Sequence, residues 1–123
     1  MKFYFSGIRS KRELAILQQA GVNNILVDPK SFEAAEPERH YQIALDSGSY
    51  WHFKHNQTLT TQMYQDTLNR LPLQRFDWLT INDVIGNPDA SRENWQRMNQ
   101  LAIQTIPVWQ WGSTEDDLKY YLD

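Results

Sequence analysis

Cysteine is missing from this sequence of 123 residues. Its absence excludes disulfide bonds, thiolate nucleophiles and cysteine-based zinc sites within the chain. An excess of positive charge is missing too, since 12 Lys and Arg face 15 Asp and Glu and give a net charge of −3. A protein that coats nucleic acid carries a basic face, so this balance argues against that role. The same charge balance is compatible with an enzyme that binds one nucleotide through a few local residues.

A long apolar run is also absent, because no stretch approaches the ~18 residues at which a membrane-spanning helix is expected. The apolar stretch that follows Met1 is too short for the hydrophobic region of a signal peptide. We therefore expect a soluble cytoplasmic protein without a membrane partner. Apolar residues make up 41% and aromatic residues 13%, which suffices for a folded core, and the length favours a single domain over residues 1–123.

Short apolar segments alternate with helical patterns about five times, which predicts an α/β fold with a parallel sheet and right-handed crossovers. Two architectures fit this pattern. One is an open doubly wound sheet, and the other is about five parallel βα units that resemble the first part of a (βα)8 TIM barrel, whose full length is about 250 residues. The five expected strands are residues 2–5, 24–27, 42–45, 76–81 and 105–109.

Three of the expected strands run into an aspartate, namely Asp28, Asp46 and Asp83. Ligands and catalytic groups collect at the C-terminal end of a parallel sheet, so three carboxylates there predict one site. Asp46 and Asp83 would lie at the same C-terminal edge of the sheet. One member of such a pair can act as an acid and the other as a base when their environments separate the two pKa values. Aspartate after a strand is also a good turn former and helix N-cap, which leaves a purely structural role open.

The sharpest motif is the sequence Asp-Ser-Gly-Ser-Tyr-Trp, which begins at Asp46. Ser47 and Gly48 place that carboxylate on a tight turn, because glycine permits a positive φ and a close backbone approach. Tyr50 and Trp51 offer rings that can stack on a planar ligand, and a carboxylate accepts hydrogen bonds from the N–H groups of a purine edge. The alternative is a structural turn over a buried aromatic pair.

Two histidines, His52 and His55, lie three residues apart and close after this motif. With a carboxylate they would form part of a metal site. No third well-placed ligand accompanies them in the sequence, and loop histidines commonly face solvent. We therefore expect no metal and no other cofactor.

An aromatic and a basic feature lie outside this motif. Trp109 follows the last expected strand, where it can stack on a base or pack against the end of the sheet. Arg9, Lys11 and Arg12 follow the first expected strand and precede a helix. They are placed to meet a phosphate at the start of that helix, or they form a solvated face.

The run Ile-Ala-Leu-Asp-Ser-Gly at residues 43–48 resembles the Asp-Ser-Gly-Gly-Phe motif of the tRNA-guanine transglycosylases. Residues 77–88 are similar to a later strand in the divergent phage and bacterial 7-deazaguanine branch of that family. Residues 93–95 and 106–109 are also similar to that branch, in the same order. The resemblance covers most of the chain from Gln42 onward.

The resemblance implies a (βα)8 barrel and a glycosyltransferase that exchanges a guanine in tRNA or DNA for a 7-deazaguanine base. It implies that Asp46 contacts the base and helps proton transfer, that Asp83 lies near the base pocket, and that Ser47 and Gly48 hold the turn. Ser49 stands where the family has a second glycine. The nucleophilic aspartate and the zinc site of the family belong to the later half of its barrel, for which we find no counterpart here.

Three hypotheses for function follow. The first is a protein that binds guanine or 7-deazaguanine with Asp46 and Asp83, stacks Tyr50, Trp51 or Trp109 on the ring, and forms part of a base-exchange enzyme. The second is a non-catalytic interaction protein, or half-barrel, that completes its sheet with a second copy or a partner chain, because exposed sheet edges are a liability. The third is an unrelated small enzyme with an open α/β fold.

Overall fold

The computed structural model describes all 123 residues and contains one parallel sheet of three strands in the order β1-β2-β3. Six α-helices and one short 3-10 helix accompany the sheet. None of the helices combines the length and the apolar character needed to cross a membrane. The strands are β1 (Asn24–Val27), β2 (Gln42–Leu45) and β3 (Phe76–Leu79); the helices are α1 (Lys11–Gln19), α2 (Pro29–Ala35), α3 (Ser49–Lys54), α4 (Thr61–Asn69), α5 (Pro88–Gln100) and α6 (Glu115–Leu122), and the 3-10 helix is η1 (Leu73–Arg75).

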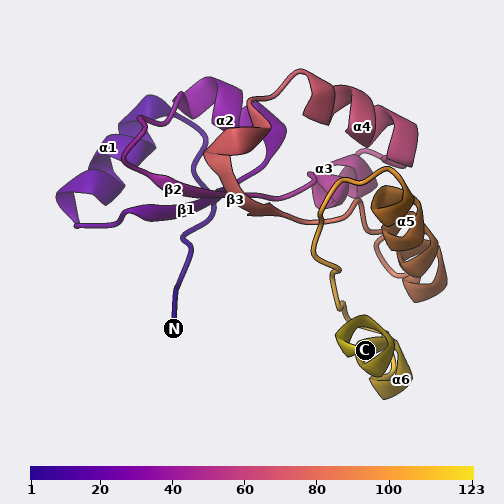
Figure 1. The fold of residues 1–123 in the computed structure, drawn as a ribbon. Coiled ribbons are helices and arrows are strands. Elements are labelled where there is room, and N and C mark those ends of the chain that lie inside the picture. Colours follow the sequence, from indigo (N-terminus) through magenta and orange to yellow (C-terminus); the bar gives the residue numbers. More distant parts are fainter.

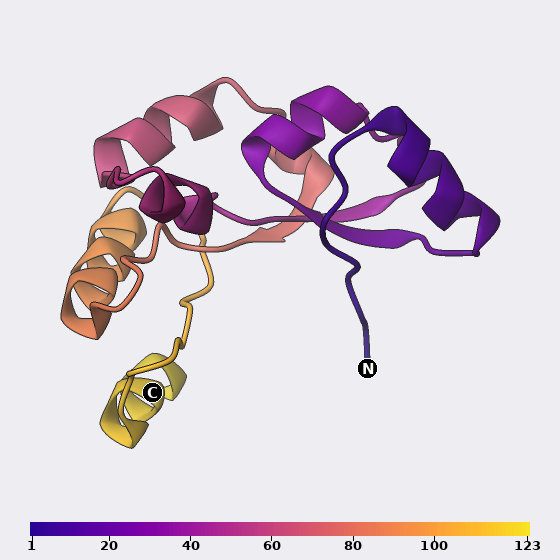
Figure 2. The same cartoon turned by 180° about the vertical axis from the view of Figure 1, so that it is seen from behind.

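The helices α1, α2 and α4 lie on one side of the sheet (Figure 1). No helix lies directly over the opposite face when the molecule is seen from behind, where the N-terminal segment leads away and α6 lies beyond the end of the sheet (Figure 2). Buried side chains of alternate strand residues and of the facing helices fill the space between the sheet and the helices, and each large aliphatic side chain among them contributes about 1.5–3 kcal/mol by leaving water. They include Ile25 and Val27 of β1, Ile43 and Leu45 of β2, Leu79 of β3, Leu14 of α1, Ala35 of α2, and Tyr64 and Leu68 of α4.

The expectation of about five parallel βα units, as in the first part of a (βα)8 barrel, is wrong, because only three strands form. The first and last expected strands each retain a single parallel bridge, between Phe5 and Ile25 and between Ile106 and Thr80. Gly7 adopts a φ of +91° and turns the chain soon after the first bridge. No ladder hydrogen bond to β3 follows the second bridge, which Ile106 makes directly before Pro107.

The segment directly after the Asp46 turn, which carries Tyr50, Trp51 and both histidines, is largely helical. The structure contains the short helix α3 here, and its N-cap Gly48 is left-handed with a φ of +84°. The rings of Trp51 and His55 stack with centroids 4.0 Å apart. They stand four residues apart, the spacing at which side chains meet on a helix surface, so this contact supports the turn.

Candidate functional site at the carboxyl edge of the sheet

Polar residues occupy one row where the parallel strands end. The N–H of Asp46 donates to the carbonyl of Val27 at 2.8 Å, and the N–H of Thr80 donates to the carbonyl of Leu45 at 2.9 Å. The ladder therefore continues one residue beyond β2 and β3, and Asp28 follows β1 in the same register. It brings Asp28, Asp46 and Thr80 side by side at the carboxyl edge, where ligands bind in open α/β sheets.

Asp28 has a structural role at this edge. One of its carboxylate oxygens accepts from the N–H of Ser31 at 2.7 Å and caps α2, with Pro29 at the first helical position. Proline suits that position because its missing N–H would have no partner there. This is the helix-capping alternative that the sequence left open, and it limits what the same carboxylate can offer to a ligand.

The turn after β2 is held by its own hydrogen bonds. A carboxylate oxygen of Asp46 accepts from the N–H of Gly48 at 3.0 Å, the geometry of an Asx turn. The N–H of Ser47 donates to the hydroxyl of Thr80 at 3.0 Å, and the hydroxyls of Ser47 and Ser49 lie 2.8 Å apart. These contacts join β2 to β3 and fix where the Asp46 carboxylate points.

Asp83 lies in the segment that follows β3, and only 8% of its surface is exposed. Burial and the nearby charge of Asp46 raise the pKa of Asp83 to about 6. Burial also raises the pKa of Asp46, and the charge of Asp28 adds to that rise. The charge of Asp46 thus acts on Asp83, its partner in the pair that the sequence predicted, and Asp83 holds a proton well above the usual pH range of an aspartate.

Tyr64 of α4 lies close to both of these acids. Its ring is fully buried, and its hydroxyl donates to the carbonyl of Thr80 at 2.7 Å. Burial raises the pKa of Tyr64, and the charges of Asp46 and Asp83 raise it further. The phenol is therefore neutral and holds the end of β3 against α4.

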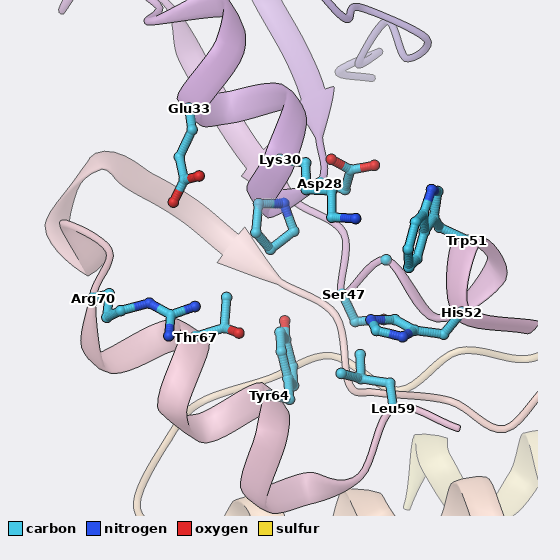
Figure 3. A pocket seen from close by; sticks show the side chains of 12 residues that line it. Asp28, Lys30, Glu33, Ser47, Trp51, His52, Leu59, Tyr64, Thr67 and Arg70 are labelled. Atoms are coloured by element: carbon cyan, nitrogen blue, oxygen red, sulfur yellow. The ribbon is translucent and has the colours of Figure 1, made fainter. Parts of the chain in front are cut away.

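Two cavities of about 270 and 560 Å³ adjoin at this edge and share Asp28, Lys30, Gly48 and Trp51. Figure 3 shows the smaller one, in which side chains of α4 face those of α2 across the strand ends. Asp46 lines the larger cavity, whereas Asp83 lines neither. A ligand in the larger cavity would therefore meet only one member of the carboxylate pair.

Both faces of the Trp51 indole are occupied. The Lys30 Nζ lies 3.2 Å from a ring centroid, and the His55 ring stacks at 4.0 Å with a tilt of 24°. Two groups this close to the same rings would clash on one face, so they lie on opposite faces. A base can stack on Trp51 only by displacing Lys30 or His55, which makes Trp51 a residue that positions Lys30.

The other two predicted stacking residues are placed differently. Tyr50 is 60% exposed and lines the larger cavity, with the Lys54 Nζ 5.6 Å from its ring centroid. Trp109 is 52% exposed, donates its indole N–H to the carbonyl of Thr114 at 3.1 Å, and lines neither cavity. Tyr50 is thus a largely exposed ring of the larger cavity, with the Phe53 ring stacked beside it at a centroid distance of 6.3 Å.

The two histidines make contacts within and just after their own helix. The Nδ1 of His52 lies 3.2 Å from the side-chain oxygen of Gln57, and the Nδ1 of His55 lies 2.8 Å from the carbonyl of Trp51. No three His, Asp or Glu side chains are arranged to share a metal ion.

The sequence reasoning named Arg9 as a possible phosphate contact but missed three other basic residues of the site, Lys30, Lys54 and Arg70. Lys30 and Lys54 line the larger cavity together with Arg9, and Arg70 lines the smaller cavity with Lys30. Lys30 comes two residues after Asp28, so its position beside a strand end was a usable signal. Lys54 stands four residues after Tyr50, which carries information only once residues 49–54 are known to be helical.

Comparison of the chain with protein-family models, with curated proteins and with solved structures finds no match in any of the three. The resemblance to the tRNA-guanine transglycosylases is therefore left as a prediction from the motifs alone.

Proposed function

We propose that the larger cavity binds a guanine-like nucleobase through the carboxylate of Asp46. The observation that carries this proposal is the position of Asp46, which lines a cavity of about 560 Å³ at the carboxyl edge of the sheet. This volume lies within the range of ~300–1,000 Å³ that holds small-molecule ligands. The ring N–H and the amino group of guanine are adjacent donors, and an ionised carboxylate accepts both.

The residues around Asp46 have separate roles in the proposed binding. Ser47 and Gly48 hold the turn that aims Asp46, and Tyr50 presents an exposed ring from α3 that can stack on the base. Asp83 lines neither cavity and so does not touch the base, although its pKa responds to burial and to the charge of Asp46. The proposal is for binding, because Asp28, the other aspartate of the cavity, is committed to capping α2. A nucleobase ligand also fits the expected cytoplasmic location.

Calorimetric titration with guanine and with 7-deazaguanine tests this proposal. We expect saturable binding by the wild type and at least tenfold weaker binding by Asp46→Asn, which keeps the size of the side chain but loses an acceptor. Asp66→Asn is the matched control, because Asp66 is an exposed residue of α4 outside both cavities. Equal binding by Asp46→Asn, or no binding of either base at millimolar concentration, would overturn the proposal. Circular dichroism establishes that each variant is folded.

Self-association is a second candidate, favoured by the uncovered face and the edges of the sheet. The outermost segments of the sheet pair on one side only, and they carry apolar side chains that are largely exposed. A second copy that covered these edges would remove an aggregation hazard. Light scattering at micromolar concentration tests self-association, because a measured mass equal to that of one chain would exclude it. The exposed side chains are those of Met1, Phe3, Phe5 and Ile106.

A further inference from the structure

The basic side chains of the protein fall into two groups. Half of them are held by partners, either by a carboxylate or, for Arg75, by two backbone carbonyls. The other half have no carboxylate within 4.0 Å. The first group is Lys2, Lys11, Arg75, Arg92, Arg97 and Lys119. The second group is Arg9, Arg12, Lys30, Arg39, Lys54 and Arg70.

Four of the six cations in the second group line the two cavities. Arg9, Lys30 and Lys54 line the larger cavity and Arg70 lines the smaller one, whereas none of the cations with partners lines either. The larger cavity has three cations against the two carboxylates of Asp28 and Asp46, a small positive excess in a chain whose net charge is −3. Unpaired cations around a cavity raise the local concentration of an anionic ligand.

Three separate elements contribute these cations to the larger cavity. Arg9 precedes α1, Lys30 lies in α2 and Lys54 lies in α3. The ammonium groups of Lys30 and Lys54 rest near the rings of Trp51 and Tyr50, at 3.2 and 5.6 Å from the ring centroids. An aromatic face attracts a cation without using its N–H donors as a carboxylate would, so these donors stay available to a ligand.

The same cavity therefore offers two kinds of recognition. Asp46 supplies a hydrogen-bond acceptor, and Arg9, Lys30 and Lys54 supply cationic donors. A neutral base would use only the hydrogen-bond acceptor of Asp46. A molecule with N–H donors at one end and a negative group at the other uses both, and a phosphate monoester carries about −1.5 to −2 charges at pH 7. Arginine also binds phosphate through two parallel N–H groups.

We infer that the cavity binds a guanine-like nucleoside 5′-monophosphate, with the phosphate held by Arg9, Lys30 and Lys54. This inference rests on the proposed function, because Asp46 has to hold the base for the phosphate to reach the basic side chains. It goes further by defining the ligand class as a phosphorylated nucleoside.

The test compares calorimetric titrations with guanine, guanosine, guanosine 5′-monophosphate and ribose 5-phosphate. We expect the monophosphate to bind at least tenfold more tightly than guanosine. The double variant Arg9→Gln, Lys54→Gln should lose most of that difference and still bind guanine. The matched control is Arg12→Gln, Arg39→Gln, which removes the same charge from two unpaired cations outside both cavities. Lys30 is kept because it packs on Trp51.

The outcomes separate this inference from the proposed function. If guanine binds and the monophosphate gains nothing over guanosine, the phosphate site is overturned while the base site stands. If ribose 5-phosphate binds through Arg9 and Lys54 and guanine does not bind, the base site is overturned while the phosphate site stands. If the control double variant loses as much affinity as the test variant, the gain reflects the overall charge, and the phosphate site is overturned.

Discussion

The Nζ of Lys30 lies 3.2 Å from a ring centroid of Trp51, directly over the indole. Lys30 belongs to α2 and Trp51 to α3, so this contact joins the two helices that follow β1 and β2. Both residues line both cavities. The pair therefore links the shape of the site to the stability of α3, a helix of six residues that is too short to be stable alone.

Removing the charge of Lys30 should destabilise the protein. We expect Lys30→Met to lower the free energy of unfolding by about 0.5–1 kcal/mol, the value for an exposed cation over a ring, because methionine retains most of the apolar stem but loses the attraction of the cation to the ring. Urea denaturation measures the change. Lys54→Met is the comparison, since the Lys54 Nζ lies 5.6 Å from the Tyr50 ring centroid and should cost less. Equal losses in the two variants would contradict a special role for the Lys30 contact.

The stability of the protein should depend on pH through Asp83. Its pKa is raised to about 6 in the folded protein, above the value of about 3.9 in an unfolded chain. The folded state therefore binds the proton more tightly, and this contribution to stability is complete below pH ~4 and is lost as pH rises through ~6. The loss amounts to at most about 2–3 kcal/mol, at 1.36 kcal/mol for each pKa unit.

Asp83→Asn isolates this effect, because the amide cannot ionise. We expect the variant to show a smaller fall in unfolding free energy between pH 4 and 7 than the wild type does, as measured by urea denaturation at each pH. Asp66→Asn should retain the full fall, since Asp66 is exposed on α4. A wild-type profile that is flat across this range would rule out the raised pKa.

The coupling between Asp46 and Asp83 predicts a second pH effect. The charge of Asp46 raises the pKa of Asp83, so Asp46→Asn should lower that pKa toward its ordinary value. A carbon-13 NMR titration of the Asp83 carboxyl group follows the change directly. Asp77→Asn serves as the control, because Asp77 is exposed and forms its hydrogen bond with Tyr4, away from Asp83. An Asp83 pKa that is the same in wild type and in Asp46→Asn would show that the two carboxylates do not interact.

The sequence predicted the centre of the sheet because the local signals there are strong. Residues 24–27 and 42–45 are short apolar segments that end in Asp-Pro and Asp-Ser-Gly, and both form strands. Phe5 and Ile106 lie in segments of similar composition, yet each makes only one bridge. A strand needs a continuous partner and burial on at least one face, and neither requirement can be read from apolar composition alone.

The candidate site was predictable to a similar extent. Parallel strands imply that Asp28 and Asp46 meet at one edge, and the observed ladder brings them together. The contact of Lys30 with Trp51 depends on two helices that are distant in sequence, so no local pattern reveals it. The helix that carries Trp51 has only six residues, too few for a helical period to stand out. The sequence could therefore point to the carboxylates and to Arg9, but not to Lys30 and Lys54 beside them.

Gly48 should be required for its backbone conformation rather than for space. Its φ is +84°, and an added Cβ would meet its nearest atoms, in Asp28 and Pro29, at the ordinary distances of 3.8 and 3.9 Å. We expect Gly48→Ala to lower the unfolding free energy by about 1–2 kcal/mol, the cost of a left-handed conformation for a residue with a side chain. Gly48→Asn should recover part of this loss, because asparagine tolerates that conformation better. Urea denaturation of the three proteins measures this. If backbone strain decides, the free energy of unfolding falls in the order glycine, asparagine, alanine. Equal losses in both variants would show that contact with the added side chain decides. Gly48 also donates to Asp46 at 3.0 Å, so the same order is expected for guanine affinity in the calorimetric titration.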